Sequence, residues 1–335
     1  MELKPIEQQV VVVFGASSGI GRETALRFAQ RGAKLVVAAR SEAGLQSLVD
    51  EIRGEGGEAV AVPANVTNLE QVKAVAAAAV EQYGRLDTWV HVAGVGVYAT
   101  FEQMTPREFK RIIDVNLVGA VYGAMAALPF LREGGGALIE ISSVEAKRAF
   151  PYHSAYAASK HGMAGFLDVL RMELKHQGVP VSVTNIMPAA INTPFFSNAR
   201  TKLGVKPMGV PPFYQPGIVA DAILYAAEHP TPEIIAGGAA KFFLFGQRVA
   251  PRLMDAIVER MGFPMQRTEE PKSDEEPYNL FEPSTGDHRV EGDFSHQARG
   301  TSLGTWLETH PVAKQALSGA ALAGVAMLMT RALRK

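Results

Sequence analysis

The chain of 335 residues contains no cysteine. Disulfide bonds, thiol nucleophiles and cysteine-ligated metals are therefore excluded, and the absence fits a reducing, cytoplasmic compartment. A strong net charge is also missing, because the formal value is −1, so no bulk field attracts nucleic acid or an anionic membrane. The first nine residues are polar and carry two acids, which does not predict a signal peptide. We expect no metal site and no nucleic-acid partner.

Apolar residues, at 47% of the chain, are plentiful and occur in short runs. Residues 10–14 form an unbroken apolar run of the kind seen in parallel strands buried on both faces. Comparable runs alternate with helical stretches of ten to fifteen residues, and they occupy residues 34–39, 58–63, 88–92, 137–143, 179–186 and 233–236. This alternation predicts an α/β fold with a doubly wound parallel sheet, the Rossmann fold.

A glycine-rich turn follows the first predicted strand. Gly15, Gly19 and Gly21 separate that strand from a helical stretch that ends near Gly32. Backbone N–H groups and the helix dipole at such a junction hold a pyrophosphate. The alternative is an ordinary tight turn, but the position between strand and helix favours dinucleotide binding.

The second predicted strand ends at Arg40 and Ser41. In this fold, an acid at that point accepts from the 2′-hydroxyl of NAD, whereas an arginine pairs with the 2′-phosphate of NADP. Arg40 therefore favours NADP(H). The alternative is that Arg40 only caps the strand in solvent.

Three residues predict a site for carbonyl or alcohol chemistry. Tyr156 and Lys160 lie four residues apart on a predicted helix and so share one face. An adjacent ammonium favours the phenolate, so we expect the tyrosine pKa to fall below its usual value of about 10. Ser143 ends a predicted strand and faces the crevice where open α/β sheets bind ligands. Alone, the tyrosine–lysine pair would also fit an exposed helix face.

Together these motifs resemble the short-chain dehydrogenase/reductase family over about residues 8–245. The matching residues, in the family's order and spacing, are Gly15, Gly19, Gly21, Ala93, Gly94, Asn116, Ser143, Tyr156, Lys160, Pro188 and Thr193. The resemblance implies that Tyr156 is the acid/base and that Ser143 polarises the carbonyl. It also implies that Lys160 holds the nicotinamide ribose and lowers the tyrosine pKa, and that Asn116 supports a water in a proton relay.

The resemblance also implies a set of residues that bind the dinucleotide. They are Gly15, Ser17, Ser18, Gly19, Ile20, Gly21, Arg40, Ser41, Asn65, Val66, Ala93, Gly94, Tyr156, Lys160, Pro188, Ile191 and Thr193. Four positions depart from the family pattern, namely Phe14, Asn65, His91 and Ala189. They concern the sheet and the adenine end, so they affect expected cofactor affinity more than chemistry. We expect His91 to be a strand residue with satisfied hydrogen bonds.

The predicted substrate walls are apolar and aromatic. They comprise Val95, Val97, Tyr98, Phe150, Tyr152, Phe195, Phe196, Phe213 and Tyr214. Such walls suit a hydrophobic ketone or alcohol. Glu145 and Arg148 are expected to face solvent, while His153 is a candidate for substrate contact.

The C-terminal part exceeds what the family's core needs. We expect a catalytic domain over residues 1–246, a helix over 247–263, a polar linker over 264–311 and an apolar Ala/Gly-rich helix over 312–335. The linker composition predicts poor order or wrapping over the surface, with residues 278–281 and 306–307 as docking points. The uncharged run at 315–330 is short for a spanning helix. It leaves open a helix on protein or in solvent, peripheral membrane contact, and a tail anchor.

The leading interpretation is an NADP-dependent oxidoreductase for a carbonyl or secondary alcohol on a small hydrophobic substrate. The alternative is a dinucleotide-sensing binding or scaffold protein whose tail docks a partner. The family resemblance implies a homo-oligomer, a dimer or tetramer formed through helices that flank the sheet.

Overall fold

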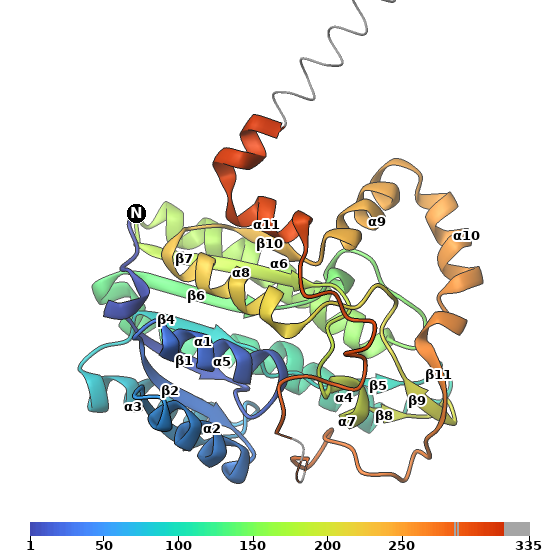
Figure 1. The fold of residues 1–335 in the computed structure, drawn as a ribbon, viewed down its shortest axis with the longest axis horizontal. Coiled ribbons are helices and arrows are strands. Elements are labelled where there is room, and N and C mark those ends of the chain that lie inside the picture. Colours follow the sequence, from blue (N-terminus) through green and yellow to red (C-terminus); the bar gives the residue numbers. More distant parts are fainter. Residues whose placement is uncertain (285, 287, 318–335) are drawn as a thin grey trace, which may run out of the picture.

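The computed structural model describes residues 1–284, 286 and 288–317, and its centre is a seven-stranded parallel sheet (Figure 1). The strand order is β10-β7-β6-β4-β1-β2-β3, and every neighbouring pair is parallel. The strands are β1 (Val10–Phe14), β2 (Lys34–Ala39), β3 (Glu58–Pro63), β4 (Thr88–His91), β6 (Gly136–Ile141), β7 (Val181–Pro188) and β10 (Glu233–Ala236). The predicted doubly wound sheet is confirmed.

Helices cover both faces of the sheet. One face packs against α1 (Gly19–Gln30), α2 (Glu42–Gly54) and α8 (Pro216–Glu228), and the other against α3 (Leu69–Tyr83), α5 (Gly119–Gly134) and α6 (Ser154–His176). Val11 and Val13 of β1 point into the first core, while Val10 and Val12 point into the second. Both faces of the strand are buried, which is why its sequence is continuously apolar.

The helix that precedes β6 changes its winding part-way. It begins as α4 (Pro106–Ile113), capped by Thr105, whose hydroxyl accepts from the Glu108 N–H at 3.3 Å. It then passes through a π-helical turn, η2 (Asp114–Val118), into α5. Among the described residues, this continuous helix is the one stretch long and apolar enough to cross a membrane, and half of its most apolar window is buried within the fold.

Several short elements lie at the carboxyl ends of the strands. They are β5 (Val97–Tyr98) with β8 (Arg200–Thr201), β9 (Val205–Pro207) with β11 (Arg267–Pro271), α7 (Phe195–Asn198), the 3₁₀ turn η3 (Val144–Ala146) after β6 and the 3₁₀ turn η4 (Pro264–Gln266) before β11. A further 3₁₀ turn, η1 (Ile6–Gln8), precedes β1 at the start of the chain.

The C-terminal extension leaves the sheet after β10. It forms α9 (Gly238–Val249) and α10 (Pro251–Met261), where Pro251 divides a region for which the sequence predicts one helix. The chain then runs along the side toward which the strand arrows point and returns to α11 (Leu303–Thr309), beside β10 (Figure 1). Most of the apolar helix predicted for 312–335 lies outside the described residues, as do the membrane alternatives that depend on it.

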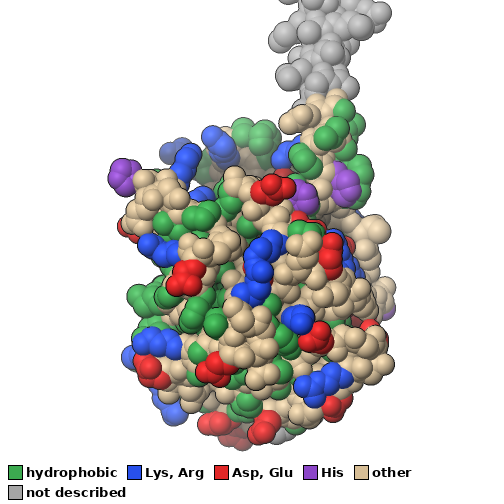
Figure 2. Space-filling model, turned by 90° about the vertical axis from the view of Figure 1, so that its left-hand side faces the viewer, with side chains coloured by type: hydrophobic (Ala, Val, Ile, Leu, Met, Phe, Trp, Pro, Cys, Tyr) green, Lys and Arg blue, Asp and Glu red, His purple; other side chains and the backbone are tan. Residues whose placement is uncertain are grey.

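Acidic and basic side chains are mixed on the face shown in Figure 2. No patch of a single sign dominates that view, as a formal net charge of −1 leads one to expect.

Candidate active site

A cavity of about 360 Å³ lies at the carboxyl ends of the parallel strands. Its lining includes residues from the ends of β1, β2, β4, β6 and β7. Open α/β sheets bind ligands at this edge. The volume falls within the range of small-molecule and cofactor sites.

The glycine-rich turn forms one end of the cavity floor. Gly15 has a φ of +97°, and a Cβ atom there would lie 2.6 Å from the Ala93 backbone nitrogen. A Cβ atom on Gly21 would lie 2.1 Å from the Gly15 carbonyl oxygen. Only glycine lets α1 start this close to the turn. The resulting backbone cradle at a helix N-terminus fits the pyrophosphate of a dinucleotide.

Arg40 lies at the end of β2, where the sequence predicts the adenosine ribose. Its Nη1 donates to the Phe281 carbonyl at 3.0 Å and its Nη2 to the Asn279 carbonyl at 2.6 Å. Burial lowers its pKa to about 10, with a further lowering by the nearby Arg111 charge. Arg40 is therefore no solvent-facing strand cap, because it joins the catalytic domain to the extension.

Ser143, Tyr156 and Lys160 converge on the same cavity. Ser143 caps η3, and its Oγ accepts from the Glu145 N–H at 3.1 Å. Tyr156 and Lys160 lie one turn apart on α6, with Lys160 Nζ 5.5 Å from the centre of the tyrosine ring. Lys160 Nζ also donates to the Ile141 carbonyl at 2.8 Å, which ties α6 to the end of β6.

The cavity thus joins a glycine-rich turn at its adenosine end to a serine–tyrosine–lysine cluster. A sequence profile described as short chain dehydrogenase matches residues 9–204, more than half of the chain. The chain belongs to the short-chain dehydrogenase family. Members of this family are oxidoreductases for small molecules and use a nicotinamide dinucleotide.

Individual proteins agree with this assignment. An uncharacterized oxidoreductase, YxnA, of Bacillus subtilis is 36% identical over 333 residues, which covers 97% of this chain and 91% of that protein. An alcohol dehydrogenase of Thermococcus sibiricus, solved with 5-hydroxy-NADP, superposes with a TM-score of 0.60 at 26% identity, covering 68% of this chain and 95% of that one. A short-chain dehydrogenase/reductase of Burkholderia phymatum, solved with NAD, gives 0.68 at 24% identity, covering 76% and 96%, and shows likeness of fold.

Most of the residues predicted for a dehydrogenase site line this one cavity. They are Gly15, Ser17, Ser18, Gly19, Ile20, Arg40, Ser41, Asn65, Val66, Ala93, Gly94, Ser143, Tyr156, Lys160, Pro188, Ile191 and Thr193. Gly21 and Asn116 are outside the lining. Gly21 packs α1 on the turn, and Asn116 exchanges hydrogen bonds with the Val95 backbone, at 2.9 and 3.0 Å.

The expected direction of the Tyr156 pKa shift is wrong for the protein without dinucleotide. Burial raises the pKa of Tyr156, the Glu145 charge raises it further, and a hydrogen bond with Ser143 lowers it in part. Burial also lowers the pKa of Lys160, to about 8. Removing an ammonium and a phenolate from water disfavours both charges, and desolvation is the largest cause of each shift. Tyr156 therefore carries its proton at neutral pH.

Glu145 and Arg148 do not face solvent as predicted. Glu145 is 7% exposed, lines the cavity and contacts His153 Nδ1 at 2.6 Å, and Arg148 pairs with Asp255 of α10 at 2.6 Å. His153 also lines the cavity, with its ring 4.2 Å from that of Tyr98. The sequence gives no local signal for these positions, because Glu145 packs against the start of α6 and Arg148 pairs with a residue about a hundred positions later in the chain.

The predicted apolar walls are partly right. Val95, Tyr98, Phe150, Phe195 and Phe196 line the cavity. Val97, Phe213 and Tyr214 are instead buried in the hydrophobic packing, and Tyr152 packs against Phe263. Residues of the extension were missed as lining, including Ala239, Ala240 and Phe243 of α9, and also Gln266, Asn279, Pro283 and Ser284.

His91 is not the satisfied strand residue that we expected. It stacks on Phe14 at 5.6 Å, and neither ring nitrogen has a hydrogen-bond partner among the described residues. Burial lowers its pKa to about 3, so the ring is neutral. Glu140, its partner position on β6, is equally buried, and burial holds its pKa well above the usual value. His91 and Glu140 therefore lie on neighbouring strands, and burial disfavours the charged form of each.

Proposed function

We propose that this short-chain dehydrogenase is an NADP(H)-dependent oxidoreductase. It transfers a hydride between the dinucleotide and a carbonyl or secondary alcohol of a small hydrophobic molecule. The observation that carries this proposal is the convergence of Ser143, Tyr156 and Lys160 on a cavity continuous with the glycine-rich turn. A binding or scaffold protein of the same fold has no need for that convergence.

Each of the three side chains has a separate role in carbonyl reduction. Tyr156, protonated because burial raises its pKa, donates its proton to the carbonyl oxygen. The Ser143 hydroxyl accepts from the Glu145 N–H and hydrogen-bonds Tyr156, and with substrate bound its proton would polarise the same carbonyl oxygen. Lys160 supplies a positive charge one turn away, which stabilises the tyrosinate left after proton transfer.

The dinucleotide supplies the hydride when it is bound. The turn from Gly15 to Gly21 would hold its pyrophosphate through backbone N–H groups other than that of Gly19, which donates to the Arg289 carbonyl, and Lys160 would hold the nicotinamide ribose. Two guanidinium groups, Arg40 and Arg111, lie near the end of β2, close enough for the Arg111 charge to lower the pKa of Arg40. Two neighbouring cations at the ribose end support NADP(H) over NAD(H), because the 2′-phosphate carries negative charge.

The substrate end of the cavity supports a hydrophobic molecule. Tyr98, Phe150, Phe195 and Phe196 are aromatic, and Phe243 of α9 stacks on Phe150 at 5.2 Å. Apolar walls with a few polar groups at the reacting centre select by shape and burial. Ketones with an aromatic, lipid-like or steroid body are the expected substrates.

A fluorescence titration with NADPH and NADH, followed by a panel of apolar ketones, tests the proposal. We expect NADPH to bind more tightly than NADH and to reduce apolar ketones. Binding without turnover of any ketone would favour the sensor, while turnover confined to sugars or short hydroxy acids would contradict the substrate class. A preference for NADH would overturn the role given to Arg40.

We also propose that the enzyme forms a dimer or tetramer through α5 and α6. Met125 on α5 and Val169 and Met172 on α6 are exposed by 56%, 49% and 64%. Large apolar side chains gathered on neighbouring helices suit burial against a second copy. Light scattering of the wild type and of Met172→Glu measures the oligomeric state directly, and a monomeric wild type would contradict the proposed dimer or tetramer.

The lack of cysteine supports a cytoplasmic location.

A further inference from the structure

We propose that two segments of the C-terminal extension, residues 278–284 and 288–294, form the outer wall of the dinucleotide site and slow the release of bound dinucleotide. We refer to these two segments as the strap. The inference rests on the proposed function, since it assigns further binding residues to the same site. It is carried by contacts that fasten the strap at two places, beside Arg40 after β2 and beside Gly19 at the start of α1.

Arginine side chains hold the first segment by its backbone. Arg40 donates to the carbonyls of Asn279 and Phe281, and Arg111 Nε donates to the carbonyl between them, Leu280, at 3.0 Å. Three consecutive carbonyls are thus bound by two partly buried cations. Hydrogen bonds from a charged donor are about twice as strong as neutral ones. The segment is therefore fixed where the adenosine ribose is expected.

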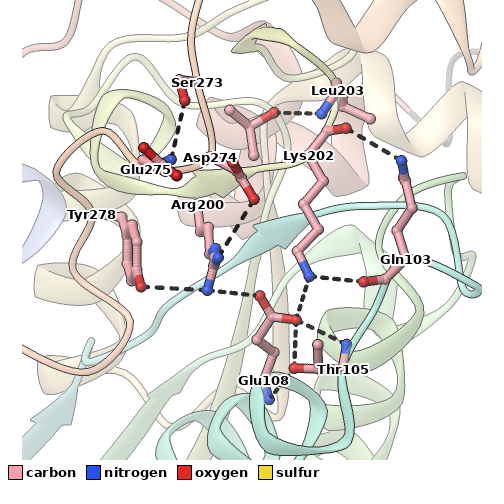
Figure 3. Close-up of polar contacts among 11 residues, drawn as sticks. Gln103, Thr105, Glu108, Arg200, Lys202, Leu203, Ser273, Asp274, Glu275 and Tyr278 are labelled. Atoms are coloured by element: carbon pink, nitrogen blue, oxygen red, sulfur yellow. Dashed lines mark hydrogen bonds and ion pairs between the residues drawn. The ribbon is translucent and has the colours of Figure 1, made fainter.

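Side-chain contacts also hold residues 278–284 against the catalytic domain. Leu280 is fully buried in the core that contains Trp89 and Ile112. The Arg107 guanidinium lies 4.3 Å from the centre of the Phe281 ring. Tyr278 receives a hydrogen bond from Arg200 at 3.3 Å, and Figure 3 shows Arg200 between Tyr278 and Glu108. Glu108 also binds Lys202, so the segment is tied to α4 and to the loop after α7.

The second segment is fastened beside the pyrophosphate end. The carbonyl of Arg289 accepts from the Gly19 N–H at 3.0 Å, at the start of α1. The Phe294 N–H donates to Asn192 Oδ1 at 2.9 Å, and its ring stacks on Phe213 at 4.5 Å. A Cβ atom on Gly292 would lie 2.4 Å from the Thr193 carbonyl oxygen, so the strap lies directly against the loop after β7.

The first segment of the strap faces the same cavity as the glycine-rich turn, and the second segment is bonded to the start of α1. Asn279, Pro283 and Ser284 line the cavity together with Gly15 and Arg40. The floor of the adenosine half therefore comes from the sheet, and its outer side comes from the extension. A dinucleotide enclosed between them leaves only when some of these contacts break, which makes release slower than from the floor alone.

The first test loosens the strap at an anchor that does not itself line the cavity. Leu280→Ala removes the buried anchor and, by the usual cost of such a truncation, speeds NADPH dissociation by about tenfold or more in stopped-flow displacement. Leu303→Ala is the matched control, because Leu303 belongs to the same extension but is 70% exposed. Equal dissociation rates for Leu280→Ala and the wild type would overturn the inference, as would tighter binding, which would mark the strap as a competitor.

The second test needs no destabilising change. Because the chain has no cysteine, Ser284→Cys introduces a single thiol on the wall, and Ser273→Cys places one at an exposed site of the same extension. We expect NADPH to slow the reaction of the thiol at 284 with a maleimide severalfold and to leave the thiol at 273 unchanged. Equal rates at 284 with and without NADPH would overturn the inference.

The two proposals fail in different ways. If the wild type binds neither NADPH nor NADH, the proposed function fails and the strap has no dinucleotide to enclose. If the wild type binds NADPH but both strap tests give wild-type behaviour, only the strap inference fails.

Discussion

The floor and the outer wall of the cavity are built by different means. The floor comes from strand ends and a glycine-rich turn within residues 10–193, where β1, β4, β6 and β7 are buried along their whole length. The wall comes from an irregular segment held mainly through its carbonyl groups, by Arg40 and Arg111. A carbonyl is present whatever the side chain, so the wall's position depends on the arginines that bind it and on a few anchors such as Leu280.

The largest expected effect comes from removing the proton donor, Tyr156, from the floor of the cavity. Tyr156→Phe deletes the proton donor and should lower kcat for ketone reduction by about a thousandfold, within the usual range for general acids. The phenyl ring keeps its packing, so the dissociation constant for NADPH should stay within about twofold, since no contact with the wall is lost. Steady-state kinetics and fluorescence titration measure both. Activity within tenfold of wild type would assign the proton to another group.

The second prediction concerns the charge of Lys160, which depends on pH. Burial lowers the pKa of Lys160 to about 8, so the side chain loses its charge as pH rises through that value. Above pH 8, kcat/KM for reduction should fall by about tenfold per pH unit, because this ratio reports groups of the free enzyme. Lys160→Arg keeps a charge at all these values. Its profile, from a lower starting rate, should be flat to pH 10, and a fall like that of wild type would exclude Lys160 as the cause.

The third prediction separates the floor from the wall at the adenosine end. Arg40→Met should weaken NADPH binding about tenfold more than NADH binding, because it removes a charged partner of the 2′-phosphate. Arg111→Met loosens the Leu280 carbonyl and should weaken both dinucleotides by a similar factor, at most about tenfold. Titration of both variants with both dinucleotides gives four dissociation constants, each compared with that of the wild type. Equal losses of NADPH and NADH in Arg40→Met would make Arg40 a strap anchor only.

The smallest expected effect lies on the part of the extension that touches neither the floor nor the strap. Phe245 on α9 is 68% exposed, so Phe245→Ser should change the unfolding free energy by less than about 0.5 kcal/mol. NADPH dissociation should match that of wild type. A clear loss of stability, measured by chemical denaturation, would show that this face is covered, for example by a second copy.

The strands of the floor were largely predictable. The ranges 10–14, 34–39, 58–63 and 233–236 agree with the structure to the residue, because buried parallel strands are locally apolar and end at turns. The same local signals predicted that Ser143 and the helix with Tyr156 and Lys160 lie at the carboxyl edge of the sheet. The direction of the Tyr156 pKa shift was not predictable, since it depends on how much protein covers the phenol.

The extension was predictable only in outline. Its polar, proline-rich composition has no period from which a path can be inferred, and residues 278–281 were expected only as a docking point. Its path depends on contacts with residues up to 270 positions away, such as Gly19 with Arg289. The ion pair of Arg148 has the same origin, because its partner Asp255 lies on α10, about a hundred positions later.

By itself, the sequence determined the parallel sheet, the glycine-rich turn and the side chains that the family's chemistry requires, because each follows from short-range pattern and spacing. The tertiary structure alone decided which groups are desolvated, where the extension runs and that Arg40 binds backbone carbonyls. Those properties arise from contacts between distant segments, and no local period in the chain encodes them.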